Sequence, residues 1–120
     1  MAAKPVMKVP AERLALYEAL IATIPGLARK GATMPYTSVN GNMFTFISAE
    51  GAVGIRLPEP DRGAFLRDFA TTLFAAHGRI MNEYVTVPDA LLERTAELKV
   101  YLELSHAFAS ALKSKATKRA

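Results

Sequence analysis

The chain has 120 residues, of which 51% are hydrophobic and 22% are charged, a balance typical of one compact domain and not of a disordered segment. It contains no cysteine, which excludes disulfides, thiolate metal sites and thiol nucleophiles. The N-terminal residues hold no apolar segment of the signal-peptide kind, and no apolar run approaches the ~18 residues of a membrane span. We therefore expect a cytoplasmic protein without membrane contact.

The net charge of +4 is concentrated at the two ends of the chain. Six of the 15 cations lie there: Lys4, Lys8, Lys113, Lys115, Lys118 and Arg119. Without these six, nine cations face 11 acids between Val9 and Leu112. Basic ends attract polyanions weakly and without sequence preference, and more often they only keep a protein in solution. We expect a flexible N-terminus (1–9), one domain (10–112) and a basic flexible tail (113–120).

The first predicted element is a helix that begins after Pro10, where the missing N–H of proline costs nothing. Pro25-Gly26 ends it. Its apolar residues recur at helical spacing: Leu14, Tyr17, Leu20, Ile21 and Ile24.

Three strands are predicted next, and their short turns make neighbouring strands antiparallel. The first is expected at Met34–Val39, followed by Asn40-Gly41, a pair that tolerates the positive φ angles of a tight two-residue turn. The second is expected at Met43–Ile47 and the third at 53–57, closed by Pro58. Strict alternation would place Phe44 and Phe46 on one face and Met43, Thr45 and Ile47 on the other. In the third strand it would place Val53, Ile55 and Leu57 opposite Gly54 and Arg56.

A second helix is expected around Asp61, whose charge suits the first turn of a helix. Its inward residues would be Phe65, Leu66, Phe69 and Leu73. The chain then turns near His77-Gly78, and Glu83–Val87 alternates as a further strand. One more short strand between Phe74 and Met81 is left open.

The last helical region starts at Pro88-Asp89. As one helix it would have two apolar faces, so we expect a break near Thr95–Lys99. Beyond the break one apolar stripe remains: Tyr101, Leu104, Ser105, Phe108 and Leu112. The order α-β-β-β-α-β(β)-α predicts an α+β two-layer sandwich, an antiparallel meander with helices on one face.

Several short motifs, in this order, resemble the TfoX/Sxy N-terminal domain family between Glu12 and Leu112. They are Lys30 and Met34 before the hairpin, the run Val39-Asn40-Gly41-Asn42-Met43-Phe44, Arg56-Leu57, and the block Gly78–Pro88. The chain departs from the family at Met34-Pro35-Tyr36-Thr37, where Met-Phe-Gly-Gly is frequent. We also expect it to act without the second domain that links longer members to competence genes. The resemblance implies a small bacterial cytoplasmic domain with no established chemistry.

The sequence shows no catalytic or metal-binding arrangement. Neither His77 nor His106 has a second ligand at helical or hairpin spacing. Ser105 and His106 are neighbours on a helix, where side chains point about 100° apart and cannot bond to each other. Helix capping and solvation account for the carboxylate pairs. We therefore expect no enzyme, no metal and no cofactor.

A loose set of polar and aromatic residues remains on or beside the strands: Lys30, Tyr36, Arg56, Arg79 and Tyr84. On a sheet face without helices they would form a recognition surface, because Arg and Tyr are enriched where partners bind. The plainer interpretation, which we weigh as the more frequent, pairs the arginines with carboxylates such as Glu83. Met34, Met43 and Met81 are interpreted as core fillers.

Three functions are compatible with these observations. The favoured one is a non-catalytic interaction or regulatory module that binds a protein partner through the open sheet face or the last helix. A homodimer through Tyr101, Leu104 and Phe108 is its simplest form. The second is a nucleic-acid-associated regulator of transcription or competence, with weak tail contacts. The third is a domain that holds a small anion with Lys30, Arg56 and Arg79.

Overall fold

The computed structural model of the chain describes residues 9–31, 34–76 and 78–112. The basic tail (113–120), His77 and all but one residue of the predicted N-terminal segment lie outside the described residues. The exception is Val9, which we expected to be flexible and which is buried against the core.

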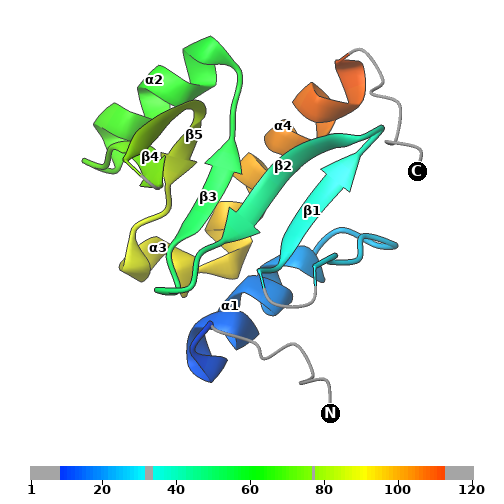
Figure 1. Ribbon diagram of the computed structural model, residues 1–120. Coiled ribbons are helices and arrows are strands. Elements are labelled where there is room, and N and C mark those ends of the chain that lie inside the picture. The colour runs from blue at the N-terminus through cyan, green and yellow to red at the C-terminus, as the bar shows by residue number, and fades with distance from the viewer. Residues whose placement is uncertain (1–8, 32–33, 77, 113–120) are drawn as a thin grey trace.

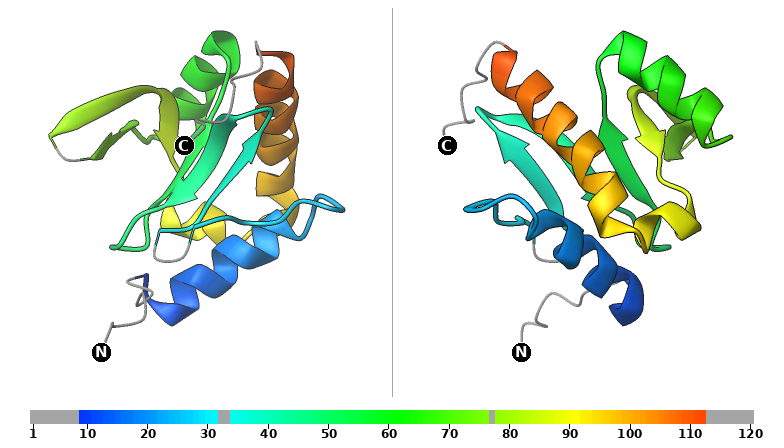
Figure 2. Two further views of the ribbon diagram at one scale, coloured as in Figure 1. Left: turned by 45° about the vertical axis from the view of Figure 1, so that its right-hand side comes forward. Right: turned by 180° about the vertical axis from the view of Figure 1, so that it is seen from behind.

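The described residues form an α+β fold of two layers, as predicted (Figures 1 and 2). The sheet is antiparallel throughout, with strand order β1-β2-β3-β5-β4. Its strands are β1 (Tyr36–Val39), β2 (Asn42–Ile47), β3 (Val53–Arg56), β4 (Leu73–Ala76) and β5 (Arg79–Thr86). The helices lie on one face of it and are α1 (Ala11–Ile21), α2 (Glu59–Asp68), α3 (Asp89–Leu92) and α4 (Thr95–Ala111).

The meander covers only the first three strands. After β3 the chain passes through α2 to the far edge of the sheet as β4, then returns as β5 beside β3. The extra strand left open by the sequence is therefore present. Leu73 was wrongly assigned to the second helix: α2 ends at Asp68, Ala70 adopts a left-handed φ of 50°, and Leu73 begins β4.

The predicted break in the last helical region is confirmed, but it lies earlier than expected, at Glu93–Arg94 between α3 and α4. The buried face of α4 is consequently shifted from the predicted stripe. Its fully enclosed residues are Leu98, Leu102, Ser105 and Ala109. These residues pack on the centre of the sheet, where α4 crosses β1, β2 and β3.

The turns of the sheet follow the sequence prediction. Asn40 and Gly41 have φ values of 53° and 77°, as the tight turn between β1 and β2 requires. The alternation of β3 is also confirmed, since Val53, Ile55 and Leu57 are enclosed in the core.

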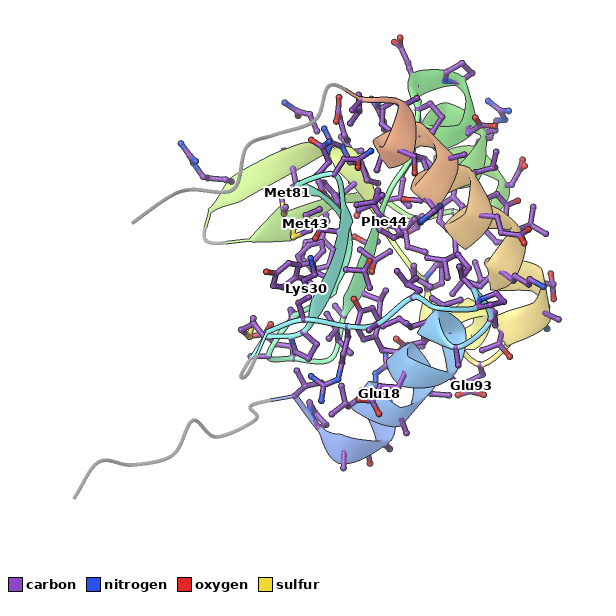
Figure 3. The ribbon with its side chains drawn as sticks, turned by 90° about the vertical axis from the view of Figure 1, so that its right-hand side faces the viewer. Glu18, Lys30, Met43, Phe44, Met81 and Glu93 are labelled. Carbon is purple, nitrogen blue, oxygen red and sulfur yellow. The ribbon has the colours of Figure 1, made fainter. Side chains whose placement is uncertain are left out.

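The alternation predicted for β2 holds from Thr45 to Ile47 but fails at Met43 and Phe44, because the strand contains a bulge. Thr37 pairs with Thr45 while the next residue, Ser38, pairs with Met43, so Phe44 is an extra residue on β2. Phe44 consequently faces the helices and meets the ring of His106 edge-on at 5.3 Å. Phe46 faces the opposite side, against Phe74 and Tyr84. The labelled side chains of Figure 3 show Phe44 toward α4 and Met43 on the uncovered side.

A buried chain of hydroxyls joins α1 to the sheet. The hydroxyl of Tyr17 lies 2.8 Å from Oγ1 of Thr45, which in turn lies 2.6 Å from Oγ1 of Thr37. All three residues are fully buried, so each hydroxyl needs the others as partners. Burial raises the pKa of Tyr17, because the charged phenolate would lose its solvent; the two threonine hydroxyls offset only part of this effect.

None of the helices formed by the described residues is long and apolar enough to cross a membrane.

Tyr17 predicts a loss of stability at alkaline pH. Its pKa in the folded chain lies above the value of 10.0 for a free tyrosine, so the stabilisation is complete below pH 10 and declines as the pH rises further. Above pH 10, this residue should lower the free energy of unfolding by about 1.4 kcal/mol per pH unit. Tyr17→Phe should cost about 1 kcal/mol at neutral pH and flatten the alkaline slope. Urea unfolding followed by circular dichroism measures both; equal slopes for the two proteins would contradict the assignment.

Candidate functional site

A two-stranded arm projects from the uncovered side of the sheet. It consists of β4 (Leu73–Ala76) and the first half of β5 (Arg79–Asn82). β5 pairs with β3 only through Tyr84–Thr86, so this first half extends past the end of β3. The β4–β5 register jumps between Leu73, opposite Val85, and Phe74, opposite Met81. This jump in register lies where the arm bends out of the sheet. Figure 2 shows the arm pointing away from the helices.

A groove lies between the arm and the turn that joins β2 to β3. Its volume is about 670 Å³, within the range of small-molecule and side-chain binding sites. The lining is largely apolar and consists of Met34, Phe46, Ser48, Ala49, Glu50, Ala52, Phe74, Ala75 and Met81. Figure 3 shows Met81 and Met43 on this side of the sheet, opposite the helices.

The floor of the groove is an aromatic cluster. The ring centroid of Phe46 lies 4.6 Å from that of Phe74 and 5.4 Å from that of Tyr84, distances at which ring pairs attract one another. Phe46 lies directly over Gly54 of β3: a Cβ atom at Gly54 would come within 2.1 Å of the Phe46 ring. Glycine is therefore required at position 54 for the ring to lie flat against the sheet.

The wall opposite the arm is the turn Ser48–Ala52. It is closed by a hydrogen bond from the N–H of Ser48 to the carbonyl of Ala52, 2.8 Å long. Arg13 of α1 donates from Nε to the carbonyl of Gly51 at 3.1 Å and forms an ion pair with Asp89 at 2.6 Å. The helix layer thus fixes the position of this wall.

Arg56, a cation on the uncovered face, is already engaged within its own chain. It pairs with Glu83 at 2.6 Å and also donates to the carbonyl of Met43 at 3.3 Å. Its guanidinium carbon lies 5.7 Å from the ring centroid of Phe108 and 5.9 Å from that of Tyr84. These contacts agree with the interpretation that Arg56 pairs with Glu83 and stabilises the sheet.

Tyr84 belongs to the same cluster and is almost fully buried. Its hydroxyl donates to the carbonyl of Met43 at 2.8 Å. Burial raises the pKa of Tyr84, and the charge of Arg56 opposes that rise only in part. The hydroxyl therefore stays protonated and acts as a structural donor.

Two exposed charges, one on the wall of the groove and one at the end of the arm, have no partner within the described residues. Glu50 lies on the wall formed by the turn and Arg79 at the outer end of the arm, and in the described part of the chain neither side chain makes a hydrogen bond or an ion pair. Both are exposed, as is the apolar Ile80 beside Arg79, 63% of whose surface is accessible.

The structure separates the predicted recognition residues. Lys30 donates from Nζ to Oγ of Ser38 at 2.9 Å, and its backbone pairs with that of Tyr36 along the outer side of β1. Arg56 and Tyr84 share one cluster, whereas Arg79 lies at the end of the arm. Within the part of the chain described here, Lys30, Arg56 and Arg79 share no hydrogen-bond or ion-pair partner.

The predicted self-association residues of α4 already have neighbours in their own chain. Tyr101 meets the rings of Phe65 and Phe69 edge-on at 4.9 and 5.6 Å. Leu104 packs on the core and Phe108 lies against Arg56.

Sequence reasoning missed the residues that line the groove. Met34 and Met81 were interpreted as core fillers, yet both line the groove on the uncovered face, and Met34 is 41% exposed. The sequence identifies Phe46 only as a residue of the second strand. The available signal was its place opposite Gly54, since a glycine within a strand marks a close approach by another group.

Ser105 and His106, the neighbouring pair on α4, both contact Phe44. The buried hydroxyl of Ser105 donates to the carbonyl of Phe44 at 3.2 Å, and His106 contacts the ring of Phe44. Among residues 9–31, 34–76 and 78–112, no group of three or more His, Cys, Asp or Glu side chains is arranged to hold a metal ion.

Comparisons with known proteins give no relative: no family model, no curated protein and no solved structure matches this chain.

Substitution of Gly54 tests the floor of the groove. Gly54→Ala should lower the free energy of unfolding by about 1–3 kcal/mol, because the new methyl group overlaps the Phe46 ring. Gly63→Ala is the matched control: it lies in the interior of α2, and a Cβ there meets nothing within 4 Å. That variant should gain about 0.5–1 kcal/mol. Thermal unfolding measures both, and equal effects would show that Phe46 does not pack on Gly54.

Proposed function

We propose that this chain is a non-catalytic interaction module that binds a second copy of itself through the uncovered face of its sheet. The observation that carries the proposal is the groove of about 670 Å³, whose largely apolar lining includes the exposed Met34. The arm that forms one side of the groove carries a second exposed apolar residue, Ile80. Apolar surface of this kind gains free energy when a partner covers it.

The sheet face is a better candidate than the last helix. Tyr101 and Phe108, which sequence reasoning favoured for self-association, are already engaged with Phe65, Phe69 and Arg56. By contrast, Met34 in the groove lining and Ile80 on the arm are exposed large apolar residues.

A second copy fits this face because the chain offers two complementary features on it. The arm presents an exposed apolar residue and an exposed cation, Ile80 and Arg79, while the groove presents an apolar lining and an exposed acid, Glu50. A two-fold axis brings each feature of one copy against the other feature of its partner, so both are covered at once.

A regulatory role within the TfoX/Sxy N-terminal domain family is part of the same proposal. It is supported by where the motifs lie: Val39–Phe44 spans the β1–β2 turn and the bulge, and Gly78–Pro88 spans β5. Met43 of the first segment and Met81 of the second lie on the uncovered face (Figure 3). The cytoplasmic location stays a prediction.

The two alternatives have less support. An anion site needs converging cations, but Arg56 is neutralised by Glu83, and Lys30 bonds to Ser38. The cations expected to attract nucleic acid lie outside the described residues. Neither alternative gains an observation from the fold.

Association in solution tests the proposal. Sedimentation equilibrium at high micromolar concentration should show a dimer. Met34→Glu should raise the dissociation constant at least about tenfold, because it would place an unpaired charge in the interface. Met34 is exposed in the single chain, so the substitution should leave folding intact.

Val100→Glu is the matched control. Val100 is 55% exposed on α4, in the helix layer, and should not affect association. A wild-type monomer would refute self-association. A dimer broken by Val100→Glu and not by Met34→Glu would move the interface to the helices.

A further inference from the structure

We propose that two copies associate by reciprocal docking of the arm, with Ile80 of each copy on the groove of the other and Arg79 of each copy paired with Glu50 of the other. This inference rests on the proposed self-association and specifies its geometry. It assigns the arm as the docking element and names the charge pair that sets its register.

The outer half of the arm has no third strand beside it among the described residues, although Phe74 of β4 packs on Phe46. A two-stranded ribbon is marginally stable in water unless a third strand or a helix covers it. Here β3 reaches only the inner part of β5, through Tyr84–Thr86, so the outer half of β5 pairs with β4 alone among the described strands. One residue of that outer half, Ile80, has 63% of its surface exposed. A docking partner would supply the missing cover.

The two edge strands of the sheet, β1 and β4, differ in the features that prevent an edge from pairing with another chain. On the β1 edge, the backbone of Lys30 pairs with Tyr36 through bonds of 2.7 and 3.0 Å, Pro35 precedes the strand and a bulge interrupts the pairing. Charged side chains, prolines and bulges are the features that keep an edge strand from pairing with another molecule.

The outer part of the β4 edge has no such protection. Phe74, Ala75 and Ala76 are apolar and pair in regular register with β5, since the register shift of this strand lies before them, at Leu73. Within the described residues no strand pairs with the outer side of β4. The contrast selects the arm, and not β1, as the edge that meets another chain.

The charges give the register. Arg79 and Glu50 are both exposed and unpaired within the described residues, and they lie on the two parts that would meet, the end of the arm and the wall of the groove. A two-fold dimer forms this pair twice. Charge complementarity of this kind selects a partner and speeds its association.

Charge reversal tests the pairing without disturbing the fold, since neither side chain has a partner to lose among the described residues. Arg79→Glu and Glu50→Arg should each weaken the homodimer about tenfold or more at low salt, because each creates two like-charge contacts. The dissociation constant is measured by sedimentation equilibrium.

The decisive experiment mixes the two variants. In a heterodimer of Arg79→Glu with Glu50→Arg, one contact joins the two substituted side chains, which carry opposite charges. The other contact joins the two native side chains, Glu50 and Arg79, so both contacts are attractive. The mixture should therefore form a heterodimer with wild-type affinity while each variant alone dissociates. Native mass spectrometry separates the three dimers by mass.

Lys99→Glu and Glu103→Arg are the matched controls. Both positions lie on α4, where Glu103 is exposed and Lys99 is half-buried, and both lack an ion pair among the described residues. The changes in net charge are the same as in the two test variants. The controls should leave the dissociation constant unchanged and show no preference for the heterodimer.

Each other outcome is decisive. A wild-type dimer that neither variant weakens would overturn the arm–groove geometry and leave the proposed self-association standing. Two weakened variants that do not recover on mixing would overturn the Arg79–Glu50 pair. A wild-type monomer at high micromolar concentration would refute both proposals.

Discussion

The structure depends on the bulge at Phe44. Side chains alternate strictly along a regular strand, so Phe44 and Phe46 would otherwise share one face. With one extra residue in β2, Phe44 packs under α4 and Phe46 lies over Gly54 on the uncovered side. Thr45, which alternates regularly with Phe46, faces the helix layer and lies 2.8 Å from the hydroxyl of Tyr17. A single strand therefore supplies the core of the helix layer and the floor of the groove.

Some polar residues of the uncovered face are held by contacts within the described chain, and others are free to meet a partner. Arg56 is held by Glu83, by the carbonyl of Met43 and by two aromatic rings, so a ligand would have to displace several contacts to reach it. Arg79 and Glu50 have no such contacts in the described chain and lose none by meeting a partner. In the proposed dimer, recognition would therefore fall to the residues with the fewest contacts, while Arg56 stabilises the sheet.

The sequence was sufficient for features governed by local chemistry. Asn40-Gly41 fixes a tight turn, Pro10 and Pro88 mark helix starts, and the alternation of Val53, Ile55 and Leu57 identifies a buried face. It was insufficient where neighbours in space decide the outcome. The bulge depends on the pairing between β1 and β2. The left-handed turn falls on Ala70, whereas glycine is the residue that would have predicted such a φ. Leu73 also follows Phe65, Leu66 and Phe69 at helical spacing, so periodicity alone places it in α2.

The groove could not be predicted for a related reason. Its walls come from β4 and from the turn after β2, which are distant in sequence and meet only because the β4–β5 arm leaves the plane of the sheet. The arm and the groove wall carry two kinds of side chain, apolar and charged, which would contribute differently to an interface. The apolar lining and Ile80 supply surface whose burial is favourable with almost any apolar partner. Glu50 and Arg79 are exposed charges of modest strength, and such charges act mainly by excluding partners that present the wrong sign. In the proposed dimer, affinity and specificity would therefore arise from different residues on this face, and the signs of these two exposed charges would distinguish a second copy from any other apolar strand.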